Sequence, residues 1–141
     1  MKQSGRSPLQ ARAQALGITL VERDVIPSSR RAHECTEYAR ERDKLPVFHA
    51  SVLKAYWTQG RDIHDWAVLE EFAHAAGLDG KDMREQVAAG QYKHAVDERV
   101  EAAHELGVHA VPTFLFADRF AVEGAQTFET FDKVMQRVLA G

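Results

Sequence analysis

The sequence predicts a mixed α/β domain in which several helices interrupt a small sheet. Most of the chain places apolar residues at helical spacing, whereas two short runs near the carboxyl end are rich in aromatic and β-branched residues. The expected order is helix, strand, several helices, hairpin and helix. Helices inserted into a small sheet are typical of a mixed fold.

Length and composition indicate one soluble globular domain. The chain has 141 residues, of which 45% are hydrophobic and 28% charged. A net charge of −3 provides no electrostatic reason to expect a nucleic-acid partner. The polar amino terminus resembles no signal peptide, and no apolar run is long enough to span a membrane. Because Cys35 is the one cysteine, no disulfide forms within the chain, and we expect a cytoplasmic protein.

The first elements are expected to be a short helix and a strand. Ser7 suits a helix N-cap, Pro8 the first helical position and Gly17 the helix end. Residues 18–23 are rich in β-branched side chains and predict a strand, which Pro27 ends.

Helical patterns then fill the middle of the chain. Helices are expected from Ser28 or Ser29 to about Lys44, from Pro46 to the turn at residues 60–62, from an Asp65 cap to Gly77, from Lys81 to Ala88, and from Gln91 to Leu106. Four of them, all but the helix from Lys81 to Ala88, show an apolar stripe that predicts one buried face.

A hairpin and a last helix close the chain. Residues 113–116 and 120–122 read as strands separated by Ala117-Asp118-Arg119. Thr127 is the expected cap of the final helix, in which Phe128, Phe131, Met135 and Val138 lie on one side.

The most informative stretch joins the last of the middle helices to the hairpin. Gly107 ends a helix, and Pro112 stands directly before a hydrophobic strand, where its missing N–H is tolerated. On composition alone, a trans proline at an ordinary strand start is favoured. A cis Val111–Pro112 bond would instead leave the backbone groups of Val111 exposed, and exposed backbone at a strand end can bind an extended peptide.

Several stretches together resemble the DsbA family, and most closely its FrnE-like branch of dithiol-disulfide isomerases. They are Ile26–Glu34, Glu37–Arg40, Phe48-His49, Tyr56-Trp57, Gly60–Ile63, Ala76–Asp79, Gly107–Phe114 and Val122–Gln126. The resemblance runs from about Leu9 to Leu139, and the order of these pieces is more specific than any one of them.

The resemblance implies an α/β, thioredoxin-like (DsbA-type) fold with an all-helical insertion and with the first β-strand missing. Residues 1–27 and 107–141 would form a partial thioredoxin-like domain, and residues 28–106 the insertion. It also implies a cis-proline loop at Val111, Pro112 and Thr113, where the backbone at Val111 pairs with bound substrate or thiol.

The family's Cys-x-x-Cys motif has no counterpart in this sequence. The chemistry needs both thiols, because one attacks a disulfide and the other resolves the mixed disulfide. Cys35 lies within a predicted helix on its apolar stripe, so we interpret it as a buried structural cysteine. We therefore expect no catalytic residue in this chain, which starts where the family's first long helix would be ending.

Two hypotheses about function remain open. One is a truncated or degenerate thiol-disulfide oxidoreductase homologue that is redox-inactive as written. The other is a non-redox module that holds an extended peptide, glutathione or another thiol at the Val111-Pro112-Thr113 loop. A weaker third option is a glutathione-dependent isomerase of the same fold, but Ser4 and Ser7 do not match the serine of that group.

Other site chemistries and partners find little support. His104 and His109 are five apart with Gly107 between them, so they share no helical face, and we expect no metal and no cofactor. With the first strand missing, strands 18–23 and 113–116 would have unpaired edges. We expect them to pair with each other directly or to form a homodimer.

Overall fold

The computed structural model describes residues 8–141. Its elements are α1 (Pro8–Ala15), α2 (Arg30–Glu41), α3 (Leu45–Thr58), α4 (Trp66–Ala75), α5 (Gly80–Ala88), α6 (Lys93–Glu105), β1 (Thr113–Phe116), β2 (Phe120–Glu123) and α7 (Phe128–Leu139). This is the predicted mixed α/β order, apart from one strand. Across residues 8–141, no helix combines the length and the apolar character needed to cross a lipid bilayer.

The chain divides into two compact units. The first ends at Asp97 and the second comprises residues 98–141, so the division falls within α6. The domain boundaries implied by the family resemblance, 1–27 with 107–141 around 28–106, stay a prediction.

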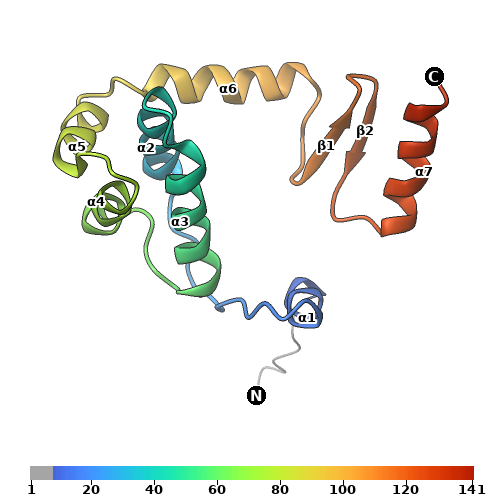
Figure 1. The fold of residues 1–141 in the computed structure, drawn as a ribbon, viewed down its shortest axis with the longest axis horizontal. Coiled ribbons are helices and arrows are strands. Elements are labelled where there is room, and N and C mark those ends of the chain that lie inside the picture. The colour runs from blue at the N-terminus through green and yellow to red at the C-terminus, as the bar shows by residue number, and fades with distance from the viewer. Residues whose placement is uncertain (1–7) are drawn as a thin grey trace. The chain divides into compact units, whose positions relative to one another are not determined.

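The core of the first unit lies among α2, α3, α4 and α5, which pack on one another in Figure 1. Its most deeply buried large side chains are Tyr38, Phe48, Leu69, Met83 and Cys35. All of them except Met83 come from the apolar stripes that the sequence predicts. Burial of these faces, rather than intrinsic helix propensity, stabilises helices as short as α4 and α5.

Acidic caps position two of these helices. The Asp65 side chain accepts a 3.0 Å hydrogen bond from the Ala67 N–H, which confirms the predicted cap of α4. Asp79, which the sequence analysis did not predict as a cap, caps α5 in the same way by accepting from the N–H groups of Lys81 and Asp82. The predicted Ser7 cap lies outside the described residues.

The strand predicted at residues 18–23 is wrong. The segment belongs to no helix and to no sheet among residues 8–141. Instead, the Val21 N–H donates to the Trp57 carbonyl at the end of α3. A segment rich in β-branched residues becomes a strand only when another strand supplies a ladder of hydrogen bonds. The local sequence does not specify that partner strand.

The second unit contains the hairpin and α7. Strand β1 pairs antiparallel with β2, with Phe114 opposite Val122 and Phe116 opposite Phe120. The turn between them holds Ala117 and Asp118 at φ 50° and 53°, the positive values typical of a type I′ turn. Helix α7 contacts both strands and lies beside them in Figure 1. The Thr127 hydroxyl accepts from the Thr130 N–H, as predicted.

Candidate functional site

A defined helix end leads into the predicted site. At the end of α6, Gly107 has φ 75°, its N–H donates to the His104 carbonyl, and the Val108 N–H donates to the Ala103 carbonyl. These two bonds form a Schellman motif, which satisfies the last helical carbonyls and turns the chain away from the helix axis. The sequence predicted this ending from Gly107.

The loop that follows contains all three predicted site residues. The peptide bond between Val111 and Pro112 is cis, and the Val111 side chain is 89% exposed. The Thr113 hydroxyl donates to the Ala110 carbonyl at 2.7 Å, which closes the loop on itself. The Gly124 N–H donates to the Pro112 carbonyl, also at 2.7 Å. Both ends of the loop are therefore held, while Val111 between them stays open.

The bond from Gly124 to Pro112 establishes which backbone groups of β1 face β2. In an antiparallel pair, alternate residues turn their N–H and C=O groups toward the partner strand. With Pro112 bonded to Gly124, Phe114 and Phe116 also face β2, and Thr113 and Leu115 face away from it. Within residues 8–141 the backbone of Val111 has no hydrogen-bond partner. We call the row Val111, Thr113 and Leu115 the outer edge of β1.

The side chains of β1 point alternately to the two faces of the hairpin. Phe114 and Phe116 lie over α7, with their ring centroids 4.9 and 6.1 Å from that of Phe131. Leu115 points to the opposite face of the hairpin and is 47% exposed. Within residues 8–141, the outer edge of β1 has no partner strand, and α7 packs against one face of the strand.

Cys35 lies in the first unit and is fully buried within α2. Burial raises the pKa of its thiol to about 12, and the nearby Glu34 charge acts in the same direction. The reactive form of a cysteine is the thiolate, so Cys35 is a poor nucleophile at neutral pH. This matches its predicted structural role.

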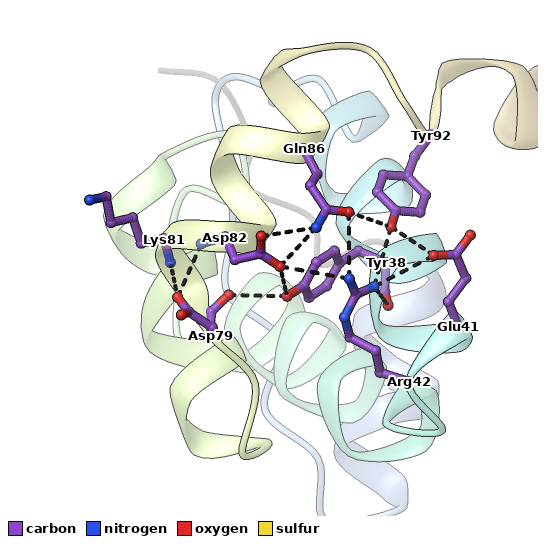
Figure 2. Close-up of polar contacts among 8 residues, drawn as sticks. All are labelled: Tyr38, Glu41, Arg42, Asp79, Lys81, Asp82, Gln86 and Tyr92. Carbon is purple, nitrogen blue, oxygen red and sulfur yellow. Dashed lines mark hydrogen bonds and ion pairs between the residues drawn. The ribbon is translucent and has the colours of Figure 1, made fainter.

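A polar cluster that the sequence did not reveal joins α2 to α5 (Figure 2). The Tyr38 hydroxyl donates to Asp82 at 2.7 Å, and the Arg42 guanidinium lies 3.5 Å from the centroid of the Tyr38 ring. Arg42 also donates to the hydroxyl of Tyr92, which in turn donates to Glu41. Tyr92 immediately precedes α6, so the cluster holds the start of that helix against α2 and α5.

The role of this Tyr38 cluster is structural. Burial, followed by the hydrogen bond to Asp82, raises the pKa of Tyr38 to about 12, and burial also raises the pKa of Tyr92. Both phenols therefore stay protonated at neutral pH, and neither acts as a base or nucleophile. No sequence pattern marks this cluster, because Tyr38, Asp82 and Tyr92 are far apart in the chain.

A groove of about 520 Å³ lies between α1, residues 20–26 and the end of α3. Trp57, Leu20 and Ile26 contribute to its walls, whereas the guanidinium of Arg23 bonds the carbonyls of Tyr56 and Arg61. Of its charged lining residues, Glu22 accepts a hydrogen bond from Gln10 in α1, so the described contacts of this groove join segments of the first unit.

Comparison with known proteins agrees with this architecture. The model of the DSBA-like thioredoxin domain family matches residues 6–136. The crystal structure of a probable DsbA oxidoreductase from Streptomyces coelicolor superposes with a TM-score of 0.81 at 27% identity, covering 94% of this chain and 58% of that one. The uncharacterized protein YwbO of Bacillus subtilis (strain 168) is 26% identical over 133 residues, which are 92% of this chain and 66% of YwbO. The chain thus spans less than two thirds of either protein.

Proposed function

The chain belongs to the DSBA-like thioredoxin domain family, and from that premise we propose that it carries the substrate-holding side of a thiol-disulfide oxidoreductase site without performing dithiol exchange itself. The observation that carries the proposal is the outer edge of β1, where Val111, Thr113 and Leu115 present backbone groups beside the cis proline. Such an edge binds an extended chain by strand addition, through main-chain hydrogen bonds.

The absence of dithiol exchange follows from the cysteine content of this chain. Exchange needs a thiolate that attacks and a second thiol that resolves the mixed disulfide. Cys35 supplies one sulfur, and burial in α2 keeps it protonated. We therefore expect this 141-residue chain not to accelerate the reduction of insulin by dithiothreitol.

A matched variant makes this assay specific. Cys35→Ala removes the last thiol and should give the same background rate as the unmodified chain. Turnover by the unmodified chain that disappears in Cys35→Ala would refute the proposal, because it would show that Cys35 exchanges thiols.

Binding is tested by adding an uncharged extended peptide, or reduced glutathione, to the isotope-labelled chain. Strand addition of the peptide on the outer edge should shift the amide signals of Val111, Thr113 and Leu115. The amides of Ala121 and Glu123 face the other edge of the hairpin and serve as internal controls. If neither ligand shifts the three outer-edge amides at millimolar concentration, the binding proposal fails.

The peptide is favoured over glutathione by the length of the edge. Val111, Thr113 and Leu115 present three successive positions for main-chain pairing, whereas glutathione has too few peptide units to engage all of them. We expect glutathione to shift Val111 and Thr113 and to leave Leu115 unchanged.

A further inference from the structure

We propose that His33 and His49 form a pH-sensitive contact between α2 and α3. When both imidazoles are neutral the two helices pack stably, and when both are protonated their repulsion and an unsatisfied buried donor weaken the packing. The contact lies entirely within the first unit, so it goes beyond the proposed function and does not depend on it.

His49 supplies a buried polar atom at this contact. It follows the fully buried Phe48 in α3, the helix that lies against α2 in Figure 1. Its Nδ1 atom is buried and has no hydrogen-bond partner within residues 8–141. In a neutral imidazole one ring nitrogen carries no hydrogen, whereas in the cation both nitrogens are donors. Protonation of His49 would therefore leave a charged donor away from water and without an acceptor, which is costly.

His33 lies close enough to His49 for the charges of the two side chains to interact. Partial removal of the His33 ring from water, then His49 and then Arg30 lower the pKa of His33, and Glu37 acts in the opposite direction. Arg30 and Glu37 lie with His33 on α2, and His49 lies on α3. A charge on His49 thus makes protonation of His33 harder.

Glu37 is the carboxylate that favours a protonated His33, and it already has a cationic partner. Its side chain is buried and forms a 3.1 Å ion pair with Arg40. The charge of Arg40 offsets that of Glu37, so Glu37 compensates a protonated His33 only in part.

Arg30 adds positive charge one turn before His33. Its guanidinium donates to Glu34 at 2.7 Å, to Asp97 of α6 at 2.5 Å and to the Lys93 carbonyl at 2.8 Å. The two carboxylates offset the Arg30 charge, yet Arg30 still lowers the pKa of His33. Because Arg30 and His33 share the first turns of α2, loosening these turns in acid also weakens the hold on the start of α6.

The lowered pKa of His33 determines the direction of the pH dependence. Its ordinary pKa is 6.5 and its pKa in the folded chain is lower, so the unfolded chain takes up this proton first as pH falls. The stability that neutral His33 contributes is present above pH 6.5 and is lost as pH falls through the folded pKa. Protonation of His49 adds to the loss.

The test is urea unfolding of the full chain between about pH 7.5 and about pH 5, followed by tryptophan fluorescence. Trp57 and Trp66 are the two tryptophans, and both report on the first unit. Over this range the unfolding equilibrium constant of the unmodified chain should rise at least about threefold more than that of His33→Gln or His49→Gln. His64→Gln is the matched control, because the exposed His64 lies in the same unit, and it should keep the full pH dependence.

An NMR titration of the imidazole C–H signals measures the contact without relying on stability. In the unmodified chain His33 should titrate below pH 6.5, and in His49→Gln its midpoint should move up toward 6.5, because one cause of the low pKa is gone. If His49→Gln does not fold, the unfolding comparison between His33→Gln and His64→Gln decides the question.

Two results would overturn the proposal. One is a His33 midpoint that is the same with and without His49. The other is a pH dependence of unfolding in His33→Gln that equals that of His64→Gln. Neither measurement involves peptide binding, so the proposed function stands or fails separately.

Discussion

The hydroxyl of Tyr38 donates a 2.7 Å hydrogen bond to the carboxylate of Asp82 and thereby joins α2 to α5. The Tyr38 ring is almost fully buried, and the Arg42 guanidinium covers one of its faces. This contact anchors the Tyr38 cluster that holds the start of α6, the helix that leads to the cis-proline loop.

Replacing Tyr38 with phenylalanine should destabilise the chain by about 1–2 kcal/mol, because a buried ring keeps its packing but loses a hydrogen bond to a charged group. Urea unfolding at neutral pH measures the change in the free energy of unfolding. Tyr56→Phe is the control, since the half-buried Tyr56 ring contacts Arg23 and Trp57 through its faces and edges. An equal loss in both variants would contradict the importance of the Asp82 contact.

The raised pKa of Tyr38 predicts a loss of stability in alkali. The folded pKa is about 12, above the ordinary value of 10.0, so the unfolded chain releases this proton first. Stability is then fully present below about pH 10 and is lost as pH rises toward 12. Urea unfolding between pH 8 and 12 should show a shallower decline in Tyr38→Phe than in the unmodified chain, and parallel curves would argue against this linkage.

Phe131 and Phe128 should respond very differently to truncation, although both lie on the apolar side of α7. Phe131 contacts Phe114 and Phe116, whereas Phe128 is 86% exposed. We expect Phe131→Ala to destabilise the hairpin unit by about 2–3 kcal/mol, below the range for fully buried rings, and Phe128→Ala to change it by less than about 0.5 kcal/mol. Hydrogen exchange of the β1 and β2 amides reports this unit directly.

The hairpin turn should become more stable when Ala117 is replaced by glycine. Ala117 has φ 50°, a conformation that alanine adopts at a cost and glycine adopts freely. We expect Ala117→Gly to stabilise by about 0.5–1 kcal/mol, after allowing for the greater freedom of glycine in the unfolded chain. Arg119→Gly is the control, because Arg119 is not among the residues with positive φ, and it should destabilise. Thermal unfolding of both variants distinguishes strain relief from a general effect of glycine.

Local chemistry in the sequence determined where most helices begin and end. Asp65 and Thr127 were recognisable as caps, and Gly107 as a helix end, because each depends on hydrogen bonds within a few residues of itself. The apolar stripe of α2 likewise indicated that Cys35 is buried, since helical spacing alone places it with Ala39 on the core side.

Tertiary structure decided everything that depends on a distant partner. Residues 18–23 have strand composition but bond to Trp57 and not to a strand, and Phe128 is exposed although it shares a stripe with Phe131. The same applies to the Tyr38 cluster and to the direction of the Thr113 and Leu115 backbone, which follows from the bond between Gly124 and Pro112. Propensity and periodicity act over a few residues, whereas strand ladders, ring contacts and polar clusters such as that of Tyr38 are formed between segments whose pairing only the folded chain specifies.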